Sequence, residues 1–159
     1  MELTRSRQAL RLAEKSFADL EAMNTAESFR DQFVETITMI RNVGSMVSNE
    51  TKGHRSPAFG AWWKTTAEDA LYKFVTEVRN DAFKYGERRN NVRHAITLHN
   101  IVGVSDEPVQ ETETSPSDYS FEVFFSGGTH DGEPVLPLLR RYLDWLRDVL
   151  LPTAESLTT

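Results

Sequence analysis

Residues 26–48, AESFRDQFVETITMIRNVGSMVS, are the stretch that decides the fold. Its apolar residues recur every three or four positions, a spacing that places them on one face of an α-helix. The stripe consists of Phe29, Phe33, Ile37, Ile40 and Val47. Four more apolar residues widen it: Val34, Met39, Val43 and Met46. A helix that is apolar over so wide a face is covered on more than one side, so we expect it at the centre of a helical bundle.

Three further segments have the same period, and capping residues set the expected bounds. The predicted helices span about residues 3–23, 25–48, 57–86 and 135–151. Asn24, with Glu27 three residues later, forms a capping box that starts the second helix. A second such pair, Thr65 with Glu68, leaves open whether the third segment is one helix or two. Pro152 is expected to end or kink the last helix.

Between the third and fourth helices the period changes to two. Residues of about 92–104 and 119–126 alternate apolar and polar side chains, which predicts two half-buried strands that pair as an antiparallel β-hairpin. The segment between them, 105–118, is acidic and contains no basic residue, so we expect a mobile loop. A lone hairpin is marginal in water, so its apolar side is expected to lie against the helices. Those inward residues are Tyr119, Phe121, Val123 and Phe125.

These segments predict a single mainly α domain over residues 1–159, an up-down four-helix bundle with the two-stranded hairpin inserted before its last helix. The composition fits a globular domain, with 39% hydrophobic and 26% charged residues. The absence of cysteine removes disulfides and thiolate chemistry and favours a reducing compartment. We find neither a signal-peptide pattern nor a run of ~20 apolar residues, so we expect a cytoplasmic protein with no membrane partner. A net charge of −6 argues against nucleic-acid binding over the whole surface and leaves a local basic patch open.

Metal, cofactor and nucleophile signals are weak throughout the sequence. The four histidines are His54, His94, His99 and His130. None of them pairs with a carboxylate at i, i+3 or i, i+4 spacing on a predicted helix, and the run 129–133, although it contains ligand-type residues, has the composition of an ordinary turn. No phosphate-binding glycine motif or serine elbow is present. We therefore expect no metal and no cofactor, and the sequence favours a protein that is not an enzyme.

Positive charge gathers at the end of the third predicted helix and just after it. The residues are Arg79, Lys84, Arg88, Arg89 and Arg93, and Asn80 adjoins the first of them. Cations at a helix C-terminus satisfy orphan carbonyls and favour the helix dipole, which is the purely structural interpretation. The alternative is a patch that binds an anion or RNA.

Residues 74–86, FVTEVRNDAFKYG, resemble the signature of the HEPN superfamily, whose members are helical bundles common in toxin–antitoxin, phage-defence and RNA-processing systems. The family motif is an arginine, often followed by asparagine, with a histidine a few residues later, and Arg79-Asn80 matches its first half. The positions open to that histidine hold Lys84, Tyr85 and Gly86. The resemblance therefore implies a bundle that has lost metal-independent RNA cleavage, because lysine is a poor proton shuttle at neutral pH. It also implies a homodimer.

The adjacent pair Trp62-Trp63 is the candidate interface. Neighbouring helical residues point ~100° apart, so we expect one ring to line the hairpin and the other to lie at an interface, or both to be buried between helices. Three functions follow in order. The first is a non-catalytic HEPN-like protein that binds RNA or a partner protein in a defence or toxin–antitoxin context. The second is a protein–protein interaction module without nucleic-acid activity, and the third is a metal-independent ribonuclease with altered acid–base residues.

Overall fold

The computed structural model describes residues 1–84, 95–101, 120–126 and 129–158 of the chain. Its helices are α1 (Thr4–Glu21), α2 (Ala26–Glu50), α3 (Pro57–Glu68), α4 (Ala70–Lys84), α5 (Val135–Trp145) and α6 (Leu151–Leu157), with a π-helical turn, η2 (Leu146–Leu150), joining the last two. Two strands lie between α4 and α5 in sequence: β1 (Ala95–Ile101) and β2 (Ser120–Ser126). The described chain is mainly helical, and the sequence prediction of a mainly α protein is confirmed.

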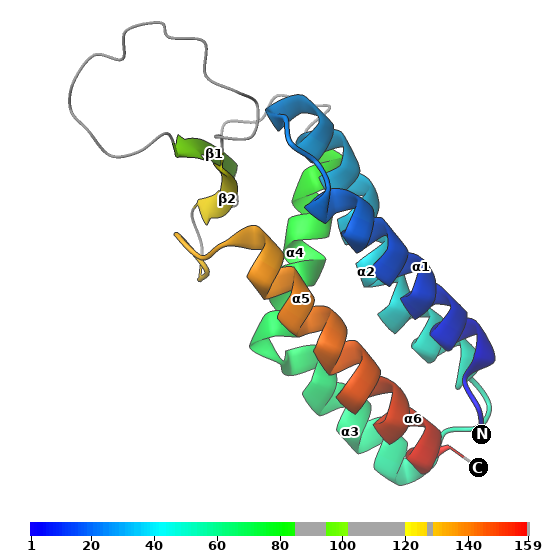
Figure 1. Cartoon of the computed structure of the whole chain (residues 1–159). Helices are drawn as coiled ribbons and strands as arrows, with labels where there is room; N and C mark the ends of the chain where they lie inside the picture. Colours follow the sequence, from blue (N-terminus) through cyan, green and yellow to red (C-terminus); the bar gives the residue numbers. More distant parts are fainter. Residues whose placement is uncertain (85–94, 102–119, 127–128, 159) are drawn as a thin grey trace, which may run out of the picture.

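The helices are long rods arranged roughly parallel to one axis (Figure 1). Helices α1 and α2 pack side by side in opposite directions, and α2 also packs on α4. The rod made by α5, η2 and α6 contacts α1 and β2 near its start and α3 near its end. The two strands lie at one end of the molecule, and the two chain ends lie together at the other (Figure 1).

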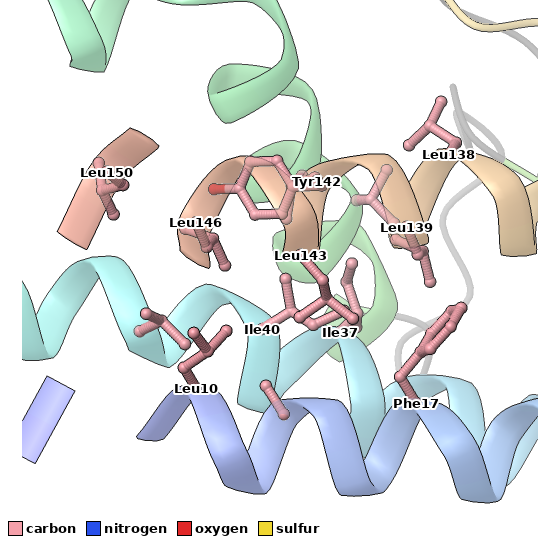
Figure 2. Close-up of a cluster of buried hydrophobic side chains, with 14 of the residues drawn as sticks. Leu10, Phe17, Ile37, Ile40, Leu138, Leu139, Tyr142, Leu143, Leu146 and Leu150 are labelled. Atoms are coloured by element: carbon pink, nitrogen blue, oxygen red, sulfur yellow. The ribbon is translucent and has the colours of Figure 1, made fainter. Parts of the chain in front are cut away.

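The hydrophobic core lies between α1, α2 and α5. Figure 2 shows Leu10 and Phe17 of α1 and Ile37 and Ile40 of α2 beneath Leu143 of α5. Every residue of the predicted stripe on α2 is at most 3% exposed. Each such side chain contributes about 1.5–3 kcal/mol by leaving water. Helix α2 therefore buries the predicted stripe, and it packs on both α1 and α4.

Strand β2 brings aromatic residues onto the helices. It pairs antiparallel with β1, with Phe125 opposite Ile96. Val123 and Phe125 are buried, and the ring of Phe125 meets the ring of Phe74 on α4 edge-on at 5.0 Å. Tyr119 and the acidic segment 105–118 lie outside the described residues, as does the side chain of Phe121.

Two predicted capping boxes are wrong, and side-chain geometry explains why. Helix α2 starts one residue later than predicted, because Thr25 and not Asn24 is its N-cap and accepts from Ser28 N–H at 3.3 Å. The segment predicted as 57–86 is two helices, and the break is at Asp69, not at Thr65. The Asp69 carboxylate accepts from the backbone N–H groups of Leu71 and Tyr72, the second and third residues of α4, at 2.9 and 3.0 Å, and an aspartate cap of this kind satisfies orphan N–H groups.

The last helix continues past Pro152 to Leu157, although the sequence predicts its end or a kink at that proline. The irregularity lies just before the proline instead. Leu151 N–H bonds to the carbonyl of Leu146, five residues back, and this is the wider spacing of a π-turn. Pro152 then sits in the first turn of α6, where its missing N–H costs little.

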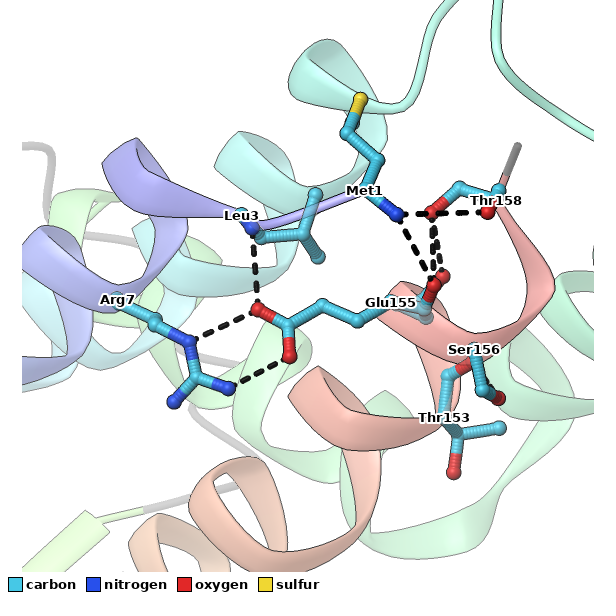
Figure 3. A network of polar contacts seen from close by, with 8 residues as sticks. Met1, Leu3, Arg7, Thr153, Glu155, Ser156 and Thr158 are labelled. Atoms are coloured by element: carbon cyan, nitrogen blue, oxygen red, sulfur yellow. Dashed lines mark hydrogen bonds and ion pairs between the residues drawn. The ribbon is translucent and has the colours of Figure 1, made fainter.

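A polar clasp fastens the start of α1 to α6 (Figure 3). The carboxylate of Glu155 accepts from Leu3 N–H at 3.0 Å and from two nitrogens of Arg7 at 2.8 and 2.6 Å. The hydrogen bond from Arg7 is the largest influence on this carboxyl and holds the pKa of Glu155 below its ordinary value. The clasp is a structural feature that joins two chain segments far apart in sequence.

Candidate functional site

Arg79 and Asn80 lie near the end of α4, on the border of its buried face. That face is set by Phe74, Val75 and Val78, which are all at most 4% exposed. Because successive helical residues turn by ~100°, Arg79 follows Val78 at the edge of the core and is half-buried, whereas Asn80 faces solvent. A half-buried arginine at such a border typically lays its apolar stem along the neighbouring apolar surface.

The two side chains contact each other. Nη1 of Arg79 donates a hydrogen bond to Oδ1 of Asn80 at 3.1 Å. A guanidinium carries five N–H donors in a planar fork, enough to hold a neighbouring side chain and an anion together. The pair is therefore a group that can bind a phosphate through a charge-assisted bond.

The remaining basic candidates are not placed beside this pair. Lys84 is the last residue of α4, and its side chain lies outside the described part of the chain. Arg88, Arg89 and Arg93 lie outside the described residues altogether. The structure thus brings together Arg79 and Asn80 and leaves the rest of the predicted basic cluster as a prediction.

A histidine lies against the same helix, although sequence analysis treats its surroundings as an ordinary turn. The ring of His130 is 4.3 Å from the ring of Phe74 between centroids, and its side chain is only 13% exposed. Its Nδ1 is 2.8 Å from Oε1 of Glu133, whose other oxygen lies 3.5 Å from Arg141. A carboxylate on one nitrogen orients a histidine ring, so Glu133 holds the ring of His130 against α4. The signal in the sequence was the i, i+3 spacing of His130 and Glu133, which the turn composition obscured.

Trp62 and Trp63 lie in a row of aromatic rings. Trp63 stacks on Phe59 at 5.8 Å and meets Tyr72 edge-on at 6.4 Å, and the row continues through Trp145. Both tryptophans are half-buried, so neither the fully buried arrangement nor the lining of the hairpin is found. Helix α3 lies at the end of the molecule away from the strands (Figure 1). Because both rings remain partly open to solvent, the interface at this pair stays a prediction.

Arginines flank this row at two points. The guanidinium of Arg41 lies 5.9 Å from the centroid of Tyr72, and that of Arg55 lies 5.3 Å from the centroid of Phe59. Such cation–π contacts fix the cations over the rings. Behind the row the hydroxyl of Tyr142 is buried, and desolvation raises its pKa above the ordinary value. Tyr142 also stacks on Trp145 of the row, with the ring centroids 5.5 Å apart.

The described chain has neither a metal cluster nor a membrane-spanning helix. In residues 1–84, 95–101, 120–126 and 129–158, no three His, Asp or Glu side chains group in a way that could hold a metal ion. Over the same ranges, the helices are too short or too polar to cross a bilayer. Comparison with protein-family models, curated proteins and solved structures finds no match for this chain.

Proposed function

We propose that this protein is a non-catalytic HEPN-like protein that binds RNA through the end of α4. The fold proposed with it is an up-down four-helix bundle with a hairpin before its last helix, assembled as a cytoplasmic homodimer in a defence or toxin–antitoxin context. The observation that supports the proposal is the contact of Arg79 with Asn80, the two residues that resemble the first half of the family motif, at a point of α4 where Arg79 is half-buried and Asn80 is exposed.

The chemistry of this end of α4 favours binding over cleavage. Arginine grips phosphate with a planar fork, whereas Lys84 adds a point charge. Cleavage without a metal needs a group that exchanges protons near pH 7, and the motif positions 84–86 carry no histidine. The ring of His130 contacts Phe74 of the same helix and Glu133, so His130 is the histidine to test if cleavage is observed.

The test is a titration of the protein into labelled single-stranded RNA at low and moderate salt, followed by a denaturing gel. Arg79→Ala is expected to weaken binding and to lower the salt slope by ~0.7, because the protein then neutralises one phosphate fewer. Lys64→Ala removes one charge from an exposed position on α3 and serves as the matched control. Equal binding by wild type and Arg79→Ala would sink the proposal. Cleaved RNA would overturn its non-catalytic part, and His130→Ala would then be the next variant.

A second candidate function is a protein interaction module, and the half-exposed Trp62 and Trp63 favour it. Tryptophan is enriched among the residues that carry most of the binding energy of interfaces. In this proposal the α3 face joins two copies of the chain. Sedimentation velocity should show a dimer for the wild type and a monomer for Trp62→Gln. A wild-type monomer at micromolar concentration would remove the homodimer from the proposal.

A further inference from the structure

Helices α3 and α4 meet at a bend that a single residue makes (Figure 1). Asp69 has backbone angles of φ −57° and ψ 133°, whereas an α-helix requires a ψ of about −42°. The sequence contains neither glycine nor proline from residue 61 to residue 84, so no helix-breaking residue causes the bend. Its cause is the Asp69 side chain, whose Oδ1 takes the N–H groups of Leu71 and Tyr72 away from the helical ladder.

A straight helix over the same residues is close to the bent one in local energy. In a straight helix the N–H groups of Leu71 and Tyr72 would bond to carbonyls four residues back, so two backbone hydrogen bonds would replace the two bonds to Asp69. Ala67 and Ala70 flank the bend and are exposed, and alanine is the strongest helix former. The chain therefore has two available conformations at this point.

Two contacts besides the cap exist only in the bent form. Lys73 forms an ion pair with Glu68, and the ring of Trp63 meets the ring of Tyr72 edge-on at 6.4 Å. In a straight helix the ion-pair partners, five residues apart, would lie on different sides, and the two rings, nine residues apart, would be ~13.5 Å apart along the axis. The ion-pair side chains are 49% and 67% exposed, so the pair adds little, and the bend depends mainly on the Asp69 cap and the ring contact.

The bend divides the chain into two halves that share one core. Helices α1, α2 and α3 precede it, and α4, the two strands, α5, η2 and α6 follow it. The halves meet where α2 packs on α4, α1 on α5 and α3 on α6. The ion pair of Arg7 with Glu155 and the strand-like pairing of Arg55 with Thr158 also join them. Because neither half buries its apolar face alone, a chain that straightened at the bend would need the complementary half of a second copy.

We propose that Asp69 is the hinge of an exchange of halves between two copies of this chain. In the exchanged dimer α3 and α4 form one continuous helix in each chain, and the first half of each copy packs on the second half of the other. Every contact between the halves is kept and now joins two chains, so a second copy is the partner that fits. The inference rests on the homodimer of the proposed function but not on its RNA binding. It differs from a dimer through Trp62, in which two closed copies touch at their surfaces.

Two neighbouring substitutions should shift the hinge in opposite directions. Asp69→Ala removes the cap and favours the straight helix. Ala70→Pro fixes the bend, because proline suits the first helical position and disfavours the α conformation in the residue before it. Asp31→Ala removes an exposed carboxylate from α2 and is the matched control for Asp69→Ala.

The readout is a disulfide between Arg55→Cys and Thr158→Cys, two paired positions in a chain that has no cysteine of its own. Paired strand residues lie at a Cα separation that a disulfide can span. In a closed copy the disulfide forms within one chain, whereas in the exchanged dimer it links two chains, which then run as a dimer on a denaturing gel without reductant. Each hinge variant is made in this double-cysteine chain, equilibrated in reductant and then oxidised. Sedimentation velocity in reductant measures the total dimer.

We expect linked chains in the double-cysteine protein with an unaltered hinge. Asp69→Ala should raise the ratio of linked to unlinked chains about fivefold or more, because one N-cap corresponds to about that factor in each chain. Ala70→Pro should lower the ratio by a similar factor, and Asp31→Ala should leave it unchanged. If Asp69→Ala loses its helical circular dichroism, the comparison of Ala70→Pro with the unaltered hinge still tests the proposal.

Three results would overturn the exchange. A dimer in sedimentation whose disulfides all lie within single chains would exclude it and leave a surface homodimer standing. A monomer in sedimentation, with the hinge unaltered and with Asp69→Ala, would remove the homodimer together with the exchange. Equal amounts of linked chains in Ala70→Pro and in Arg55→Cys alone, as in the unaltered hinge, would show that the links arise from collisions.

Discussion

Two helical glycines give a sharp test of how tightly the aromatic row is packed against α2. Gly44 lies in α2 opposite Tyr72, and Gly60 lies in α3 facing open space. A Cβ added at Gly44 would be 2.9 Å from the Tyr72 Oη and 3.1 Å from its Cε2, whereas a Cβ at Gly60 would meet nothing within 4 Å. The same substitution, glycine to alanine, therefore probes two different environments.

The two substitutions should change the free energy of unfolding by different amounts. Alanine gains about 0.8–1 kcal/mol over glycine within a helix, and Gly60→Ala should raise the free energy of unfolding by that amount. Gly44→Ala has the same gain, but Tyr72 must retreat by roughly half an ångström. The ring is held between Trp63 and Trp145, at 6.4 Å from each. Overpacking of this kind costs about 1–3 kcal/mol, so the free energy of unfolding of Gly44→Ala should be about 1–3 kcal/mol lower than that of Gly60→Ala.

Urea unfolding followed by circular dichroism measures both free energies. The double variant Gly44→Ala, Tyr72→Ala isolates the contact, because alanine at position 44 should stabilise the chain by about 1 kcal/mol once the ring is gone. If Gly44→Ala stabilised the protein as much as Gly60→Ala, the reasoning would be refuted. A cost at position 44 that persisted without the Tyr72 ring would place its cause elsewhere.

Three further variants test the clasp, the buried hydroxyl and the cap of α4. Glu155→Gln should cost about 1 kcal/mol at neutral pH, since its partner Arg7 is 42% exposed. Because the folded-state pKa of Glu155 is lowered, this stabilisation is present above the ordinary glutamate pKa and is lost as the pH falls through the folded-state pKa. A difference in unfolding free energy between wild type and Glu155→Gln that stayed constant into acid would contradict the clasp. Tyr142→Phe removes a buried hydroxyl that has no hydrogen bond within the described ranges, so thermal unfolding should show equal or higher stability, by up to about 1 kcal/mol, and a clear loss would show that the hydroxyl is bonded. Asp69→Ala should cost about 1 kcal/mol in urea unfolding because it removes the cap, against less than about 0.5 kcal/mol for Glu68→Ala, and equal losses would contradict the cap.

The central helix could be predicted from the sequence because its signal is redundant. Five apolar residues at regular spacing point to the same face, and the loss of any one would leave the pattern intact. Helix bounds depend instead on single side chains. Asn24 and Thr25 both favour an N-cap, and only the backbone angles of Thr25 decide between them. The helix end predicted at Pro152 is wrong for a related reason. The rule for proline assumes α-helical spacing, and the preceding π-turn has no sequence signature.

The candidate sites divide in the same way. Arg79 and Asn80 could be named from the sequence, but their contact could not, because adjacent helical residues point ~100° apart and the side-chain conformation of Arg79 brings the two together. A surface groove lined by Leu12, Met39 and Met46 depends instead on how α1 and α2 are rotated about their axes, which no single-helix pattern contains. Met39 and Met46 lie at the edge of the apolar stripe, and the packing of α1 leaves them half-exposed.

The clasp at Glu155 also bears on the order in which the chain folds. Its partners are 148 residues apart, from Arg7 to Glu155, whereas α1 and α2 follow each other directly. Contacts between neighbouring helices close short loops and form quickly, but a contact across almost the whole chain waits until the intervening segments have found their places. An interaction formed that late is absent from the folding transition state, so it slows unfolding and leaves the folding rate nearly unchanged. In Glu155→Gln the native state should therefore open faster while refolding proceeds at the wild-type rate, which makes docking of α6 the step that sets the lifetime of the folded protein.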